Sequence, residues 1–410
     1  MSNEKNSIPS FYRGFLKLFS GLALVKVLNF IFSIILPRFY LPVDYASLGV
    51  FTATILILVE VNTLKLDVAI FFPKEDQDAL EIVHSVFLIS FYFSIIILLI
   101  SILFIASGFY NLLYVLTALV LITYGVGQAL SAWFNRKKEY KKLNVSRVVQ
   151  AASTPILSLI FIFFFKWHFG LIMGFVLGQV ISTLYLFFSF KHLNIKLIKR
   201  SLVLKYIRRY SQFPKYGVLS SLINSISNNS IVICIKYFFG VFNAGYYTLA
   251  SRVLSIPGGM YSTAISQIYL QQASLLDNTA LRIYSKKIIW FGFLLGIIPA
   301  ILFLFFGQSI FGFVFGVKWL AAGKMAQYIA LWFFFQILIG PVGFMLDIKQ
   351  KLKFERNWNF LLLIFRALAV IVGVLLNDLF VMLLILTVVG ILMNMLLLRY
   401  VLKLTYDDTN

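Results

Sequence analysis

The chain has 410 residues, of which 61% are hydrophobic and only 12% are charged. Soluble domains are about half apolar and about a quarter charged, so this composition excludes an ordinary cytosolic enzyme. The formal net charge is nevertheless +21, from 36 Lys and Arg against 15 Asp and Glu. In a soluble protein such an excess would indicate nucleic acid, whereas a multi-span membrane protein collects Lys and Arg in its cytoplasmic loops.

Long apolar runs recur along the chain. A helix needs about 20 apolar residues to cross the roughly 30 Å hydrocarbon layer, and continuous runs exclude strands because strands of a barrel would alternate. The first run contains Lys17 and Lys26, and we expect it to be retained as a helix because it lacks a signal-peptide cleavage site. The eighth is interrupted by SIPGGMYS. The twelve predicted spans are 14–36, 46–66, 83–106, 110–133, 145–165, 169–190, 214–235, 246–268, 288–311, 325–346, 357–376 and 379–400.

The positive charges lie mostly on one side of these spans. Placing alternate loops on opposite sides puts 26 of the 36 Lys and Arg on the side of the two termini and 5 on the other. By the positive-inside rule both termini are predicted to be cytoplasmic. The excess of positive charge is therefore explained without a nucleic-acid partner. The single Cys234 and three scattered histidines predict no disulfide, no metal site and no bound cofactor.

The two halves of the chain resemble each other. A shift of 198 residues aligns Tyr12-x-x-Phe15-x-Lys17 with Tyr210-x-x-Phe213-x-Lys215 and brings 38–40 onto 236–238. We therefore predict an all-α membrane fold of two six-helix halves related by pseudo-twofold symmetry around a central cavity. The expected domains are an N-terminal lobe (1–190), a basic linker (191–212) and a C-terminal lobe (213–410). The amphipathic, basic linker is predicted to lie on anionic headgroups.

Small residues and prolines interrupt several runs. Gly170, Gly174 and Gly178 recur every four residues, which predicts a close-packing face toward a neighbouring helix. Four prolines are predicted to lie inside spans, namely Pro155, Pro257, Pro299 and Pro341.

Polar residues at helical spacing predict a hydrated cavity rather than isolated packing seams. The cations Lys26, Arg252 and Arg366 lie well inside spans, where a charge costs at least about 2.5–3.5 kcal/mol and seldom persists without a partner or a function. We predict that these three bind substrate. The other predicted cavity residues are Asn29, Ser33, Gln128, Asn224, Asn228 and Ser255.

Glu60 is the acidic residue that lies deepest in a predicted span. It is a candidate for ion coupling, together with Asp67 on the same helical face, but a structural Glu60–Lys26 ion pair is an equal alternative. Lys65 is predicted to reach the cytoplasmic interface. Cations outnumber carboxylates, so the cavity should prefer an anionic ligand, and the arginine fork suits phosphate.

Six stretches resemble the O-antigen and capsule flippases, the polysaccharide-biosynthesis branch of the multidrug/oligosaccharidyl-lipid/polysaccharide exporter superfamily. They are SGLALVKVLNFIFSIILPRFYLPVDYASLGVF (20–51), LKLDVAIFFPKEDQDA (64–79), QALSAWFNRKKEYKKLNVSRVVQ (128–150), RRYSQFPKYGVLSSLINSIS (208–227), FFGVFNAGYYTLASRVLSIP (238–257) and FGVKWLAAGKMAQYIALWFFFQILIGPVGF (315–344). In the second stretch, 64–67 reads Leu-Lys-Leu-Asp where relatives often have Arg-Tyr-Glu. Arg252 matches the family's cavity arginine in the eighth helix.

The resemblance implies a fold of two six-helix bundles that form a V-shaped central cavity. It also implies a non-enzymatic transporter of the bacterial inner membrane. It would move undecaprenyl-diphosphate-linked oligosaccharide between leaflets, by alternating access and with possible coupling to a proton or sodium gradient. Its partners would be that lipid-linked substrate, membrane lipids and other polysaccharide-assembly proteins. Two alternatives stay open at this point: a cation-coupled small-molecule exporter of the same superfamily, and a membrane glycan polymerase or ligase.

Overall fold

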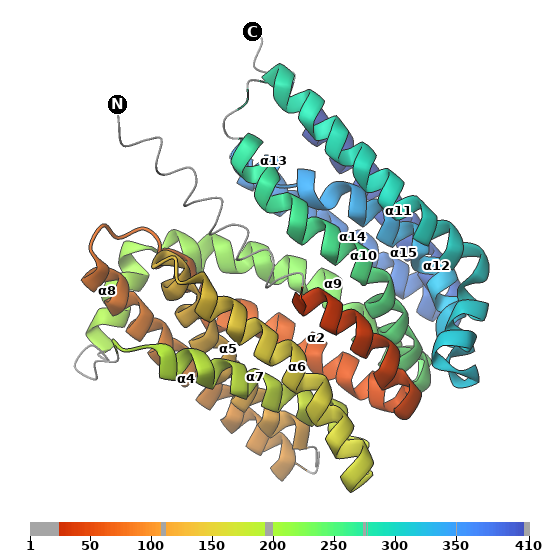
Figure 1. Cartoon of the computed structure of the whole chain (residues 1–410), viewed down its shortest axis with the longest axis horizontal. Coiled ribbons are helices and arrows are strands. Elements are labelled where there is room, and N and C mark those ends of the chain that lie inside the picture. Colours follow the sequence, from red (N-terminus) through yellow and green to blue (C-terminus); the bar gives the residue numbers. More distant parts are fainter. Residues whose placement is uncertain are drawn as a thin grey trace. The chain divides into compact units, whose positions relative to one another are not determined.

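The computed structural model describes residues 24–107, 112–192, 200–273, 276, 278–349 and 351–405, and all regular elements within these ranges are helical. A first helix covers residues 24–39. Eleven further long helices are labelled in Figure 1: α2 (Pro42–Asn62), α4 (Asp76–Ala106), α5 (Leu112–Arg136), α6 (Tyr140–Phe165), α7 (Gly170–Ser189), α9 (Val218–Phe239), α10 (Val241–Ala273), α11 (Asn278–Phe315), α12 (Leu320–Val342), α14 (Leu352–Leu375) and α15 (Leu379–Lys403). The short elements are α3 (Leu66–Ala69), α8 (Arg200–Arg209), the π-helix η2 (Phe213–Gly217), the 3₁₀-helix η3 (Val317–Trp319) and α13 (Met345–Ile348).

The predicted all-α membrane fold is confirmed. Ten of the described helices are long and apolar enough to cross a membrane. The two remaining predicted spans are the first, whose residues 14–23 lie outside the described residues, and the eighth. The eighth is one continuous helix, α10, through SIPGGMYS. Prolines lie inside α6, α10, α11 and α12, as predicted.

Several helices end where the backbone becomes left-handed. Gly240 (φ 95°) separates α9 from α10, and Gly316 (φ 102°) follows α11. Both positions favour glycine because residues with a side chain rarely adopt such positive φ values, although no other part of the described structure lies within 4 Å of either Cβ position. Asn377 (φ 50°) ends the connection after α14, and the Asp378 side chain then accepts hydrogen bonds from the amides of Phe380 and Val381. These signals let short turns join neighbouring spans.

The helices form two compact units. Unit 1 comprises the described residues of Met1–Phe32 and Phe51–Asn229, and unit 2 those of Ser33–Val50 and Ser230–Asn410. The first helix, α2 and α9 each contribute residues to both units. The division into lobes at 190 and 213 stays a prediction.

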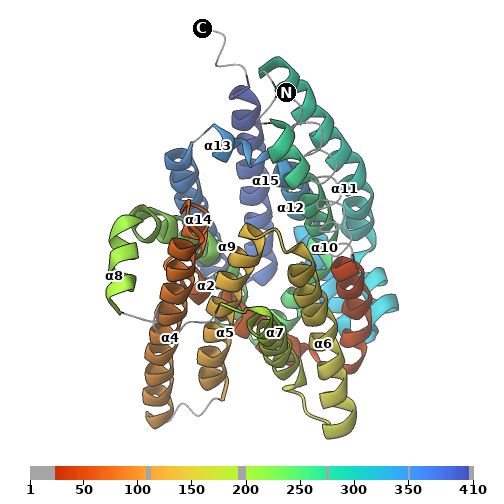
Figure 2. The ribbon, with the colours of Figure 1, turned by 60° about the vertical axis from the view of Figure 1, so that its left-hand side comes forward.

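In unit 1, α4 packs on α5, α5 packs on α7 and α7 packs on α6, and both views show α8 beside α4 (Figures 1 and 2). The core of this unit includes Trp133 and Phe134 from α5. The predicted glycine face lies between α6 and α7: a Cβ on Gly174 would overlap the Ser158 hydroxyl and the Thr154 carbonyl, and one on Gly178 would overlap the Thr154 side chain. The close packing predicted for α7 is therefore confirmed.

In unit 2, α12 is the central helix and packs against α10, α11 and α15. Its buried side chains include Trp332 and Ile337. The segment between the first helix and α2 belongs to this unit and is held by the end of α11 and η3. Trp319 Nε1 donates to the Pro37 carbonyl (2.8 Å), Lys318 Nζ donates to the Tyr40 carbonyl (2.9 Å) and Arg38 Nε donates to a carbonyl of α11 (2.9 Å).

The linker between the predicted lobes packs in part on the protein itself. Its residues 193–199 lie outside the described residues, and Arg200–Arg209 forms α8, which packs on α4. Two of the cations expected to meet headgroups instead form ion pairs with α4: Lys205 with Glu81 (3.1 Å) and Arg209 with Asp78 (3.4 Å). Sequence periodicity identified the amphipathic helix but not the protein surface that its apolar face covers.

Candidate substrate-binding site

The predicted cavity residues are divided between the two units. Unit 2 holds Ser33, Arg252, Ser255 and Arg366. Unit 1 holds Lys26, Asn29, Glu60, Asp67, Gln128, Asn224 and Asn228. Each group is described within its own unit.

Arg366 lies in the packed interior of unit 2. Its residue is 4% exposed, and its guanidinium lies 5.0 Å from the centre of the Trp332 ring. Tyr247 of α10 lies within electrostatic reach of the same guanidinium. A buried cation over an aromatic face gains from the negative charge of the ring, up to about 2 kcal/mol when desolvated. The side chain is thus held in one place by α10 and α12.

The Trp332 ring in turn depends on a glycine of α15. A Cβ on Gly390 would overlap atoms of the indole, so only glycine lets the α15 backbone approach this ring. The indole Nε1 is buried and has no hydrogen-bond partner among the described residues. A buried donor without a partner costs about 1–3 kcal/mol of folding free energy.

Arg252 is exposed, in contrast to Arg366. It lies on α10 within electrostatic reach of Tyr45 of α2. Ser255, one turn further along, is also exposed, and its hydroxyl donates to the Arg252 carbonyl (2.8 Å). An exposed arginine beside a tyrosine can donate to phosphate or sugar oxygens without any rearrangement of the core.

The remaining polar residues show mixed burial. Lys26 is half-buried and makes no ion pair within the described residues, whereas Asn29 is exposed and Ser33 is half-buried. Gln128 is half-buried, and its Oε1 accepts no hydrogen bond from the described residues. On α9, Asn224 and Asn228 are exposed and joined by an Asn228 Nδ2 to Asn224 Oδ1 hydrogen bond (2.9 Å).

Glu60 pairs with Lys65 rather than with Lys26. The Lys65 ammonium lies 2.6 Å from a Glu60 carboxylate oxygen, and both side chains are about a quarter exposed. Of the two alternatives for Glu60, the structural pair with Lys26 is therefore wrong, whereas the interfacial position of Lys65 stays a prediction. Lys65 turns back because its backbone is left-handed (φ 57°), which the sequence pattern does not reveal.

Glu60 and Asp67 were predicted to lie on one face of a single helix, but they lie on two different helices. The second span was expected to reach residue 66, but α2 ends at Asn62, and Leu64 and Lys65 both adopt positive φ before α3 begins. Asp67 accepts a hydrogen bond from the Thr63 hydroxyl (2.6 Å). Two consecutive non-glycine residues in this region store strain of about 1–2 kcal/mol each.

Sequence reasoning missed the aromatic partners of both arginines. Trp332, Tyr247 and Tyr45 entered the sequence analysis only as members of the stretches 315–344, 238–257 and 20–51. Their signal is weak, because a tryptophan in the middle of an apolar span resembles any core residue.

Within the described residues, no group of three or more His, Cys, Asp and Glu is placed to hold a metal ion.

Comparisons with known proteins identify the family. A model described as "Polysaccharide biosynthesis protein" matches residues 35–324, which is more than half of the chain. The capsular polysaccharide biosynthesis protein CapF of Staphylococcus aureus is 26% identical over 203 residues, covering 45% of this chain and 48% of CapF. The match thus spans about half the length of that curated relative.

Solved structures show the same fold at low sequence identity. The lipid II flippase MurJ in an inward closed conformation has a TM-score of 0.71 at 16% identity, covering 94% of this chain and 87% of MurJ. An inward-facing multidrug resistance MATE family transporter of the MOP superfamily has a TM-score of 0.68 at 13% identity, covering 94% and 96%. The chain belongs to the polysaccharide biosynthesis protein family and has the fold of MOP-superfamily transporters.

Proposed function

We propose that the protein is a flippase that moves undecaprenyl-diphosphate-linked oligosaccharide across the bacterial inner membrane during O-antigen, capsule or exopolysaccharide assembly. It does so by alternating access, with both termini in the cytoplasm and without covalent chemistry. The family match, the name of the CapF relative and the fold shared with a lipid II flippase support this proposal.

The observation that carries the proposal is the Glu60–Lys65 ion pair. Glu60 is the acidic residue deepest in the predicted spans, and Lys65 already neutralises it. Arg252 and Lys26 therefore keep a positive charge that this carboxylate does not offset. A transporter with excess cationic groups in its spans favours an anionic ligand, and a diphosphate carries the required charge.

The arginines would act on the diphosphate in different ways. Arg252 is exposed, so its planar fork can bind two phosphate oxygens at once. Arg366 is buried against Trp332, so it contributes a fixed positive field and meets the ligand only when α14 and its neighbours move apart. The lipid tail would stay in the bilayer while the sugars cross with the diphosphate.

A complementation experiment tests this function. Arg252→Ala should reach the membrane at the wild-type level yet fail to restore surface polysaccharide in a flippase-null strain. Arg252→Lys keeps the charge but not the fork and should restore it partially. Full restoration by Arg252→Ala and by Arg366→Ala would overturn the assignment of these cations to the substrate.

The same strain panel separates the runner-up function, a cation-coupled small-molecule exporter. Drug efflux that survives neutralisation of the arginines but is lost in Glu60→Gln would establish that function instead. Under our proposal, the main effect of Glu60→Gln is to leave the Lys65 ammonium without its ion-pair partner. The proposal also includes coupling to a proton or sodium gradient through Glu60 or Asp67. It further includes contact with other polysaccharide-assembly proteins.

A further inference from the structure

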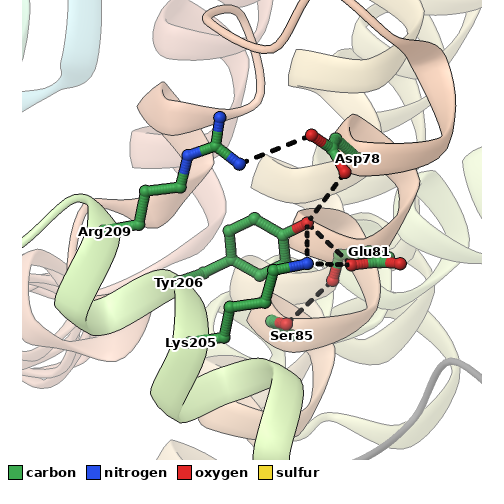
Figure 3. A network of polar contacts seen from close by, with 6 residues as sticks. All are labelled: Asp78, Glu81, Ser85, Lys205, Tyr206 and Arg209. Carbon is green, nitrogen blue, oxygen red and sulfur yellow. Dashed lines mark hydrogen bonds and ion pairs between the residues drawn. The ribbon is translucent and has the colours of Figure 1, made fainter.

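The helix α8 has two chemically different faces, and its inner face is fixed. Val203 and Ile207 pack against the core of unit 1, and Tyr206 is 0% exposed. Figure 3 shows the Tyr206 hydroxyl pointing at the start of α4, where it donates to the Glu81 carboxylate (2.7 Å) near an Asp78 oxygen (3.4 Å). These contacts define the rotation of α8 about its own axis.

The outer face carries an arginine–leucine–arginine row. Arg200, Leu204 and Arg208 are spaced by four residues and therefore lie on one side of the helix. All three are exposed, and Leu204 is 47% exposed. The sequence of α8, RSLVLKYIRR, contains no acidic residue. Because Lys205 and Arg209 are engaged by Glu81 and Asp78, the outer arginines are the ones left to meet an external anion.

The level of α8 along α4 places this row at the edge of the bilayer. Asp78 and Glu81 lie in the first two turns of α4, directly before the apolar run that begins at Ile82. In a membrane-spanning helix, that position is the boundary between headgroups and hydrocarbon. Exposed aromatic side chains flank α8 at its end: Phe72, whose ring lies 6.3 Å from that of Tyr210, and Tyr216. Aromatic residues gather at this boundary.

We propose that the outer face of α8 binds the headgroups of anionic phospholipids. Arg200 and Arg208 contact the phosphates, and Leu204 enters the boundary between headgroups and acyl chains. An amphipathic helix binds in this manner when a basic face flanks a small apolar anchor. The site is separate from the transport substrate and does not depend on its identity.

A labelled chain in nanodiscs tests the proposal. Leu204→Cys in a Cys234→Ser background is labelled with an environment-sensitive fluorophore and placed in phosphatidylcholine, alone or mixed with phosphatidylglycerol. Phosphatidylglycerol should shift the emission to the blue, and high salt should reverse the shift. When Arg200→Gln and Arg208→Gln are both introduced into the labelled protein, its preference for phosphatidylglycerol over phosphatidylcholine should fall about 30-fold.

The matched control is Lys166→Gln/Lys236→Gln, which removes the same charge from the predicted external side and should leave the shift unchanged. A second measurement uses unlabelled wild-type protein and spin-labelled phosphatidylglycerol, so that Leu204 stays in place. The motionally restricted lipid fraction should fall in the arginine double variant and not in the control. Equal emission in both lipid compositions, or equal restriction in both double variants, would overturn the proposal.

Discussion

The guanidinium of Arg366 lies 5.0 Å from the centre of the Trp332 ring, and both residues are buried in unit 2. This relationship explains how a positive charge persists inside a predicted span. The ring face supplies part of the stabilisation that water would otherwise give, and Tyr247 lies on a third helix close to the same charge. Trp332 is therefore a positioning residue for Arg366 under the proposed function.

Replacing Trp332 tests that role. Trp332→Leu removes a cation–π contact worth about 2 kcal/mol in a desolvated site, so both thermal stability and transport should fall. Trp332→Phe keeps a weaker aromatic face and should recover part of the transport at a similar membrane level. Thermal unfolding in detergent and complementation of a flippase-null strain provide the two readouts. Equal transport by the leucine and phenylalanine variants would contradict the positioning role.

The Glu60–Lys65 pair allows a double-mutant cycle. Glu60→Gln and Lys65→Gln each leave one half-buried charge without its partner, so each should lower the unfolding midpoint. The combined variant should be more stable than the two single effects predict, with a coupling free energy of about 0.5–3 kcal/mol. Strictly additive losses would show that the pair contributes nothing to stability.

The left-handed backbone of Lys65 gives a separate prediction. Both Lys65→Ala and Lys65→Gly remove the ion pair, but only glycine adopts φ 57° without a Cβ clash. Lys65→Gly should therefore be more stable than Lys65→Ala by about 1 kcal/mol, contrary to the ordinary ranking of the two residues in helices. Thermal unfolding of the two variants side by side measures the difference. An alanine variant as stable as the glycine variant would contradict the inference that the backbone is strained at Lys65.

Tyr206 makes the docking of α8 sensitive to high pH. Burial and the neighbouring Glu81 carboxylate raise the pKa of Tyr206 above its ordinary value. Because the docked hydroxyl is neutral, its contribution is complete below the unfolded pKa of about 10 and is lost as pH rises through the higher folded pKa. Lys205, Arg209 and Asp78 face the same hydroxyl.

A spin label at Ser201→Cys in the Cys234→Ser background measures this docking. Its mobility should stay constant between about pH 7 and pH 9 and rise above about pH 10. Tyr206→Phe removes the titrating hydroxyl, so the rise in mobility above pH 10 should be absent in that variant. A mobility step near neutral pH would contradict the assignment to Tyr206.

The fold was largely predictable because membrane helices are set by hydropathy and length. The spans matched continuous helices even where SIPGGMYS interrupts the apolar pattern, since Pro257 within α10 does not break that helix. Hydropathy could not place the end of α2, because the left-handed turn at Leu64 and Lys65 involves residues with no turn preference. The ion pair of Glu60 followed from that turn and was therefore missed.

The site was predictable only as a set of residue types. Charges inside spans identified Arg252 and Arg366, since their cost in lipid makes them conspicuous. Nothing in the sequence separates the exposed Arg252 from the buried Arg366, because their burial depends on packing of Trp332 and Gly390 from distant helices. Likewise, the charges of α8 were visible, but not the α4 carboxylates that engage half of them.

The most direct test of the account is the movement of lipid-linked oligosaccharide by purified protein in sealed vesicles. A fluorescent undecaprenyl-diphosphate-linked oligosaccharide is placed in both leaflets, and the fraction accessible to an external quencher is followed over time. Wild-type protein should make nearly all of it accessible, whereas Arg252→Ala, reconstituted to the same density, should leave about half protected, because spontaneous exchange of a diphosphate across hydrocarbon is slow. Half protection with wild-type protein, or full accessibility with Arg252→Ala, would contradict the account.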